Sequence, residues 1–158
     1  MIEAIYPSRR VDQDEGDAVT LELRGSDGYG SGAYGASRGD RTHKGIDFQA
    51  PHGATILSPA VGIVSRIGYP YSDDLSYRYV EILTRCVLKH RIFYITPLVK
   101  LGDKIAVGQP IGRVQNISAR YDEHLMKNHI HYEIKNGSSE YINPATLTAG
   151  VKQDRQGN

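Results

Sequence analysis

Short runs of β-branched and aromatic residues, separated by turn residues, dominate the middle of this sequence. These runs lie at residues 55–57, 61–67, 77–83, 91–95, 104–107 and 111–114. Gly, Pro and Asp stand between them at roughly ten-residue spacing, which favours an antiparallel sandwich or barrel-like sheet over an α/β crossover fold. We therefore predict a mainly β, compact antiparallel fold with few helices, the one candidate helix covering residues 119–127.

A chain of 158 residues suits one domain with short tails. We expect an N-terminal arm or edge strand over residues 1–27, a β-domain over 28–150 and a flexible tail over 151–158. The arm holds an acidic patch at residues 12–17, followed by an alternating, strand-like segment at 19–24. An arm with this many charges is usually solvated; docking to a larger assembly is the alternative.

Charge and hydrophobicity exclude several classes of protein. The 19 Lys and Arg nearly balance the 18 Asp and Glu, so no net field favours nucleic acid or an anionic membrane. Cys86 has no partner for an internal disulfide. Residues 1–10 lack the apolar core of a secretory signal, and no run approaches the roughly 18 apolar residues of a membrane span. We expect no signal peptide, no membrane insertion and no nucleic-acid partner.

The segment His129-Ile-His-Tyr-Glu-Ile134 alternates between polar and apolar residues. Residues two apart in a strand share a face, so the side chains of His129, His131 and Glu133 point to one side and the apolar ones to the other. This alternation predicts a half-buried strand with a polar, functional face. We expect His52, His90 and His124 at the surface, without a role.

A second cluster, His43-Lys-Gly-Ile-Asp47, has the residue types of a zinc site. Its two end residues would lie about 13 Å apart in an extended chain, at about 3.3 Å per residue, and a bend at Gly45 would bring them together. His43, Asp47 and one of the paired histidines then supply three ligands with a fourth position open, and the remaining histidine is within reach as general base. The plain alternative is a β-domain whose histidines only form hydrogen bonds.

Residues 28–39 are too rich in Gly and Tyr for a helix and form a loop. The loop either faces a substrate, with Tyr34 in contact, or is a linker.

Three segments in order resemble the lysostaphin-type (LytM-like) zinc endopeptidases, which cleave peptide cross-links of bacterial peptidoglycan. Residues 41–64 resemble their first signature, residues 99–112 their hairpin segment and residues 129–134 their closing His-x-His strand. The resemblance spans about residues 28–147. It implies a duplicated hybrid motif β-fold with a groove over the sheet.

The resemblance also implies roles for individual residues. A single Zn²⁺ per chain would be held by His43, Asp47 and His131, and His129 would be catalytic, assisting proton movement when activated water attacks the scissile carbonyl. Arg41, next to the first ligand segment, is a candidate contact for substrate.

One segment departs from the family pattern. Active members usually carry a second catalytic histidine in a Tyr-x-His segment, and here Thr96 takes that position in Phe93-Tyr-Ile-Thr-Pro-Leu98. This segment resembles the leukocyte-derived chemotaxin branch, whose members keep the zinc ligands and act as binding proteins. Tyr94 is the candidate replacement donor, and Thr96 a candidate substrate contact.

These observations leave three hypotheses. The first is a zinc endopeptidase acting on bacterial wall peptides, made in the bacterial cytoplasm and reaching the wall as part of a virion, such as a phage tail, or after injection or lysis. The second is a catalytically weak zinc module that binds wall peptides or a protein partner. The third rests on the similarity of residues 102–111 to hairpins of biotinyl and lipoyl carrier domains, with Met126-Lys127 as an attachment site.

Overall fold

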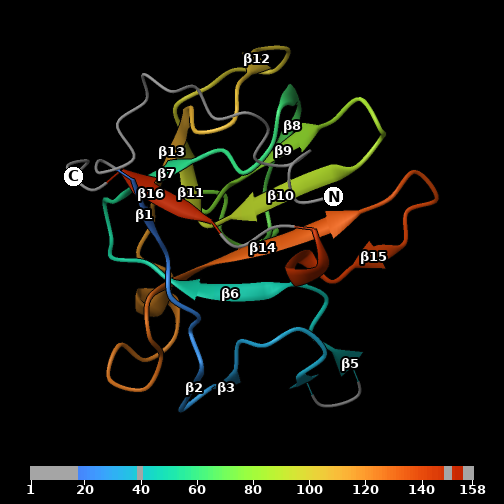
Figure 1. Ribbon diagram of the computed structural model, residues 1–158. Helices are drawn as coiled ribbons and strands as arrows, with labels where there is room; N and C mark the ends of the chain where they lie inside the picture. The colour runs from blue at the N-terminus through green and yellow to red at the C-terminus, as the bar shows by residue number, and fades with distance from the viewer. Residues whose placement is uncertain (1–17, 39–40, 148–150, 155–158) are drawn as a thin grey trace.

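The computed structural model describes residues 18–38, 41–147 and 151–154, and its ribbon is drawn in Figure 1. Nearly all regular structure is antiparallel β, which confirms the predicted fold class. The helical elements in this part of the chain are two 3₁₀ turns, η2 (Ile117–Arg120) and η3 (Pro144–Thr146). No helix among the described residues has both the length and the apolar character needed to cross a membrane.

The larger sheet has seven strands in the described chain. Its order is β12-β8-β9-β10-β14-β15, and β6 pairs with β14 as well. The strands are β6 (Ile46–Gln49), β8 (Gly62–Gly68), β9 (Tyr79–Leu83), β10 (Lys89–Phe93), β12 (Lys104–Ile105), β14 (His129–Lys135) and β15 (Tyr141–Ile142). Figure 1 shows β14 running through the middle of the molecule with β6 beside it.

The second sheet has five strands, in the order β1-β16-β7-β13-β11. Its members are β1 (Ala18–Thr20), β7 (Thr55–Leu57), β11 (Ile95–Pro97), β13 (Pro110–Val114) and β16 (Lys152–Asp154). Two small hairpins precede β6 and lie below it in Figure 1: β2 (Ser26–Asp27) with β3 (Gly30–Ser31), and β4 (Ser37–Arg38) with β5 (Arg41–Thr42).

Isoleucine and valine side chains from both sheets form one hydrophobic core. The large sheet contributes buried side chains such as Val80, Ile92 and Ile130, and the small sheet contributes Ile56 and Ile111. Burial of such β-branched side chains on pleated surfaces is what makes these short runs strands. One face of β10 and β14 is thereby committed to the core, and their other face remains for polar residues.

The end of the chain differs from the prediction. Residues 151–154 were expected in a flexible tail, but Val151 is 0% exposed and β16 pairs with β1 and β7. The strand is ordered because it forms backbone hydrogen bonds with the edge of β7 and because the Val151 side chain fills a core position. β1 lies at the edge of this sheet and is shorter than the strand expected at residues 19–24. The acidic patch and residues 155–158 lie outside the described residues.

The helix predicted over residues 119–127 is also wrong. Only η2 forms there, and a run of turns follows it. The Asp122 carboxylate accepts a hydrogen bond from the His124 backbone N–H, and the Asn116 side chain accepts one from Ala119. Such local side-chain bonds compete with helical hydrogen bonding, which explains the turns.

Candidate metal centre

Pairing between β6 and β14 brings the two histidine clusters together. Asp47 lies directly opposite His131 in the antiparallel register, and Gln49 lies opposite His129. Directly opposed residues have neighbouring side chains, so this register alone places a carboxylate beside an imidazole. His43 reaches the same point from the segment that leads into β6.

Gly45 allows this approach because the chain there runs against β14. A Cβ atom at this position would collide with the Tyr132 carbonyl oxygen and lie 2.7 Å from His131 Cε1. The sequence predicted a bend at Gly45, and the structure adds close packing under the His131 ring. The result is a distance of 3.2 Å between His43 Nε2 and Asp47 Oδ1.

Three candidate ligand atoms converge on one point. His131 Nδ1 lies 3.0 Å from His43 Nε2 and 3.0 Å from Asp47 Oδ1. The far side of each ring has an acceptor: Ala33 O is 2.9 Å from His43 Nδ1, and Glu133 Oε1 is 2.9 Å from His131 Nε2. Protons on those outer nitrogens leave both inner nitrogens with lone pairs. In this protonation state, two lone pairs and a carboxylate face one another, an arrangement that suits a bound cation.

The electrostatics of this cluster also favour a positive charge, whether a proton on His131 or a metal ion in its place. Burial lowers the pKa of His131, but hydrogen bonds to Asp47 and Glu133 outweigh it and raise this pKa to about 9. Burial raises the pKa of Asp47, but hydrogen bonds to His131 and His43 outweigh it and hold this pKa well below its usual range. The cluster therefore favours a bound positive charge.

These residues fit a zinc ion. Two imidazole nitrogens and one carboxylate oxygen are the ligand set of a catalytic zinc site with an open fourth position. His43, Asp47 and His131 form a group able to hold a metal ion, with their ligand atoms all within 4.8 Å of one another. Glu133, hydrogen-bonded to the outer nitrogen of His131, is the outer carboxylate that commonly orients a metal-bound imidazole.

His129 lies beside the three candidate ligands with its own geometry. Its Nδ1 is 2.8 Å from the Lys127 carbonyl oxygen, and its Nε2 is 3.7 Å from Asp47 Oδ2. A proton on Nδ1 leaves the Nε2 lone pair directed to the site. Burial lowers the pKa of His129, which keeps the ring neutral and able to accept a proton.

Tyr94 faces His129 across the site, with 5.7 Å between the ring centroids. Its backbone has φ 73°, a left-handed conformation that is uncommon for a bulky residue and costs energy. Burial raises the pKa of Tyr94 to about 12, so the hydroxyl stays protonated and able to donate. The Tyr71 hydroxyl is 3.4 Å away and donates to it.

A cavity of about 520 Å³ covers these residues, and its walls are rich in aromatic side chains. Sequence analysis named none of Tyr29, Tyr71 and Tyr121, which come from three separate loops, although Tyr29 belongs to the 28–39 loop that it gave as a candidate substrate-facing segment. The Tyr71 and Tyr121 hydroxyls are 2.9 Å apart, and the Tyr29 and Tyr121 rings meet edge to face. The sequence contains 11 tyrosines and no tryptophan, which hints at a tyrosine-rich site. Nothing in the sequence indicates that these three loops lie side by side.

Two of the expected substrate contacts lie outside this cavity. Thr96 is exposed on β11 because Ile95 fills the core and the next side chain must point the other way. Tyr34 packs partly buried against the hydrophobic core. Arg41 lies in β5, two residues before His43, and the structure does not describe its side chain.

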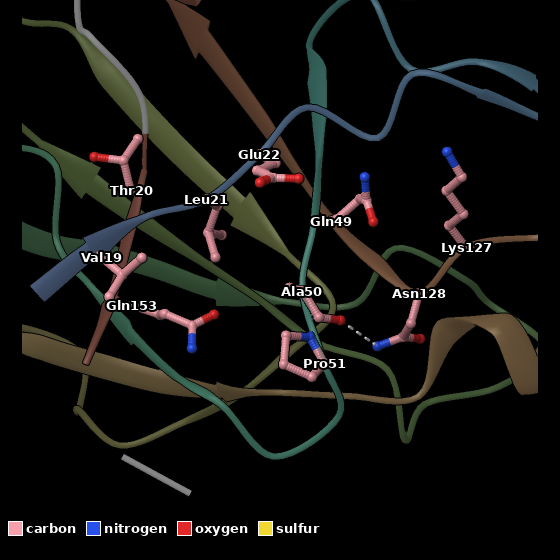
Figure 2. Close-up of a pocket in the computed structure, with 10 residues that line it drawn as sticks. All are labelled: Val19, Thr20, Leu21, Glu22, Gln49, Ala50, Pro51, Lys127, Asn128 and Gln153. Atoms are coloured by element: carbon pink, nitrogen blue, oxygen red, sulfur yellow. Dashed lines mark hydrogen bonds between the residues drawn. The ribbon is translucent and has the colours of Figure 1, made fainter. Parts of the chain in front are cut away.

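A second cavity, of about 450 Å³, lies where β1 and β16 approach the end of β6. Figure 2 shows its lining, with Leu21 and Pro51 on one side and Lys127 and Asn128 on the other. Asn128 donates a hydrogen bond to the Ala50 carbonyl there. This cavity holds none of the metal-centre residues, but one wall of it is the segment that leads into His129.

The described residues combine an antiparallel β-domain with a candidate metal centre of two histidines and one aspartate, a ligand set found in metal-dependent hydrolases. The match to a family of proteins is specific: the model of peptidase family M23 matches residues 41–144. The chain belongs to this family, which confirms the resemblance found in the motifs and replaces the carrier-domain hypothesis. Lys127, the attachment site of that hypothesis, has its Nζ on the Arg24 carbonyl oxygen.

Curated relatives and solved structures agree with the family assignment. Leukocyte cell-derived chemotaxin-2 from Bos taurus is 28% identical over 112 residues, 71% of this chain and 72% of that protein. An uncharacterized metalloprotease of Haemophilus influenzae is 31% identical over 115 residues, 68% of this chain and 21% of that protein.

Among solved structures, the catalytic domain of the prophage-encoded M23 protein EnpA from Enterococcus faecalis has a TM-score of 0.58 at 28% identity, covering 72% of this chain and 85% of that one. The catalytic domain of the antimicrobial peptidase lysostaphin from Staphylococcus simulans has a TM-score of 0.55 at 20% identity, covering 76% and 89%. The lysostaphin likeness is one of fold.

Proposed function

We propose that this protein is a zinc-dependent endopeptidase that hydrolyses peptide cross-links of bacterial peptidoglycan. The observation that carries the proposal is the convergence of His43 Nε2, Asp47 Oδ1 and His131 Nδ1 beside an imidazole whose Nε2 lone pair faces the same cavity. Membership of peptidase family M23 supports the reaction class. Likeness to EnpA and lysostaphin, the latter described as an antimicrobial peptidase, supports the bacterial wall as target.

The residues of this chain divide the work of peptide hydrolysis. His43, Asp47 and His131 would hold a zinc ion, which would supply Lewis acidity and activate water at neutral pH. His129 Nε2 accepts a proton from the attacking water and returns it to the leaving amine. The Tyr94 hydroxyl donates a hydrogen bond to the negative charge that develops on the carbonyl oxygen.

The aromatic walls of the cavity hold the peptide and exclude water. Tyr29, Tyr71 and Tyr121 offer flat apolar surfaces for the peptide, and hydrogen bonds of the Tyr71 hydroxyl to Tyr94 and Tyr121 fix two of the walls. The lining also carries charges of both signs, from Arg24, Lys44, Asp47 and Glu133, which suits a ligand with both amino and carboxyl groups.

We further propose a phage virion-associated or injected lysin, made in the bacterial cytoplasm and acting at the cell wall. The likeness to EnpA, a prophage-encoded M23 protein, supports this setting. A larger assembly such as a phage tail is the partner that would carry the chain to its substrate. Co-purification of the chain with intact particles tests this part independently of activity.

Release of soluble muropeptides from purified, cross-linked peptidoglycan tests the activity. Zinc-loaded protein is expected to release them, while Asp47→Ala loses zinc and activity and His129→Ala loses activity with zinc retained. Mass spectrometry of the products then identifies the bond. No release by protein that holds zinc at one ion per chain would contradict the proposal.

A second candidate function is a catalytically weak zinc module that binds wall peptides or a protein partner. The lining of the cavity favours it. Among the described residues, the histidines there are the two candidate ligands and His129, so no second catalytic histidine is present and Tyr94 lies on the remaining side. Relatives named leukocyte cell-derived chemotaxin-2 also support it. Sedimentation with insoluble peptidoglycan, without release of muropeptides, is the result this function predicts.

A further inference from the structure

We propose that Arg24 and Asp27 form a positioning pair for the metal centre, in which Arg24 holds the ligand Asp47 and Asp27 holds the segment that carries His129. The inference rests on the proposed function for its catalytic consequence, but not for its geometry. Both residues lie upstream of residues 41–144, the part that the family model matches. The chain thus builds part of its centre from a segment outside the residues that the family model matches.

Arg24 lies beside β6, where its backbone N–H donates to the Asp47 carbonyl oxygen. Its Nη1 donates to Asp47 Oδ2 at 2.8 Å, while Asp47 Oδ1 faces the two candidate ligand histidines. Its Nε and Nη2 donate to the two oxygens of Asp27 at 2.8 and 2.7 Å. The planar guanidinium therefore grips one carboxylate with its fork and a second one with the remaining nitrogen.

Asp27 passes this contact on to His129. Its Oδ2 accepts a hydrogen bond from the Lys127 backbone N–H at 2.9 Å, and its Oδ1 accepts one from Tyr29 N–H. The carbonyl of the same Lys127 is the acceptor for His129 Nδ1. Figure 2 shows Lys127 and Asn128 on the wall of the second cavity, where the Asn128 bond to Ala50 fixes the next residue.

Burial of the charged groups of Arg24 and Asp27 carries a desolvation penalty that calls for an explanation. Arg24 is 2% exposed, and the side chains of Asp27 and Asp47 are 5% and 4% exposed. Removing three charges from water is expensive, and hydrophobic residues of similar size often stabilise a fold as well. A buried Arg between two carboxylates, one of them a candidate metal ligand, is better explained by the orientation it imposes.

The orientation has a defined consequence for coordination. With Oδ2 held by Arg24 and Oδ1 facing His131, Asp47 would bind a metal through Oδ1 and leave a position open. Without Arg24, the carboxylate is able to rotate and bind through both oxygens, which fills the open position. Arg24 is therefore a positioning residue, not a catalytic one.

Cobalt(II) substitution measures this coordination without any substrate. Four-coordinate cobalt(II) absorbs visible light more strongly than five- or six-coordinate cobalt(II), so absorption reports whether Asp47 uses one oxygen or two. We expect Arg24→Gln to bind cobalt at one ion per chain with clearly weaker visible absorption. Arg24→Lys keeps the charge but its single ammonium cannot replace the fork, so we expect the same loss.

Arg91→Gln is the matched control, because Arg91 also pairs with buried carboxylates on this sheet. Arg91 Nε lies 2.6 Å from Glu81, and its Nη1 lies 3.5 Å from Glu133. Arg91 therefore pairs with a carboxylate that bonds a candidate ligand, whereas Arg24 bonds the candidate ligand Asp47 itself. The control is expected to leave the cobalt spectrum unchanged. An unchanged spectrum in Arg24→Gln, or full recovery in Arg24→Lys, would overturn the proposal; the latter would leave charge alone as the role of Arg24.

Turnover tests the contacts that connect Asp27 to His129 through the Lys127 backbone. If the pair acts as one unit, Arg24→Gln and Asp27→Asn each lower muropeptide release by about 10- to 100-fold, and the double variant loses little more than either one. Losses that multiply in the double variant would contradict a single unit. Absence of wall hydrolysis in the wild type would remove the proposed function and leave the cobalt result standing.

Discussion

A buried histidine and a partly buried one lie on neighbouring strands of the same sheet and face opposite sides. His90 on β10 is 0% exposed, its Nδ1 is 2.7 Å from the Tyr132 hydroxyl, and its Nε2 has no hydrogen-bond partner among the described residues. Burial lowers the pKa of His90 to about 4. On β14, carboxylates reverse the effect of burial and raise the pKa of His131 to about 9.

The difference shows that burial of a histidine does not by itself make a site. On the core face, His90 lies among side chains such as Ile92 and Ile134, and no carboxylate is bound to it in the described part of the chain. On the other face, Asp47 from β6 and Glu133 two residues along β14 both bond His131. The carboxylates turn one face into a cation site, while the other stays a neutral part of the core.

The first way to test this comparison is to remove a polar-face side chain that is not a ligand. His129→Ala is expected to lower muropeptide release by about 10²- to 10⁴-fold, because a positioned general base contributes that much. Zinc content should stay at one ion per chain, since the three ligand residues are intact. Activity assays paired with metal analysis measure both.

Loss of zinc together with activity in His129→Ala would contradict the assignment and make His129 a ligand. A thermal unfolding transition like that of the wild type is the required control, because the residue is buried.

A second variant tests Tyr94, which lies across the site from His129. Tyr94→Phe removes one hydroxyl, and the loss of one oxyanion donor typically costs about 10²- to 10³-fold in rate. We expect that loss in turnover with cobalt spectrum and zinc content unchanged. Activity equal to that of the wild type would exclude the hydroxyl from catalysis and favour Tyr94 as a wall residue.

The sequence predicted the polar face well because this face depends on local patterns. Alternation over residues 129–134 identified the strand, and the His43 and Asp47 pair needed only a bend at Gly45 between its members. The predicted β fold followed from the same kind of pattern. What these features share is that the residues that matter lie within a few positions of one another.

Features that depend on contacts between distant segments were not predicted. Arg24 and Asp47 are 23 positions apart, and Asp27 and Lys127 are 100 apart. His90 was expected at the surface, although it alternates with Ile92 in a strand and so shares its core-facing side. Thr96 was expected to contact substrate, but it lies outside the cavity that Tyr94, the predicted replacement donor, lines with a left-handed backbone.

The core face is tested by stability, not by activity. The pKa of His90 falls from 6.5 in the unfolded chain to about 4 in the fold, so the unfolded chain binds the proton more readily. Stability is therefore full above about pH 6.5 and is lost as pH falls towards 4, by about 3 kcal/mol at about 1.4 kcal/mol per pKa unit. Urea unfolding of metal-free protein at several pH values measures it.

His90→Gln isolates this effect, because glutamine keeps a hydrogen-bonding group and does not titrate. The difference in unfolding free energy between wild type and variant should shrink or change sign from pH 7 to pH 4. A difference that stays constant across this range would mean that His90 is not the residue that takes up the proton.

Glu133→Gln tests the comparison where the expected effect is smallest. The amide still accepts a hydrogen bond from His131 Nε2, but the negative charge that makes this imidazole a stronger ligand is gone. Outer carboxylates of this kind contribute about 10- to 100-fold to metal affinity or activity, and the retained hydrogen bond favours the lower end. Competition with a chelator measures zinc affinity.

Glu81→Gln is the matched control, since Glu81 is a buried carboxylate on the same face that pairs with Arg91. Equal affinities in both variants would mean that Asp47 alone separates the two faces.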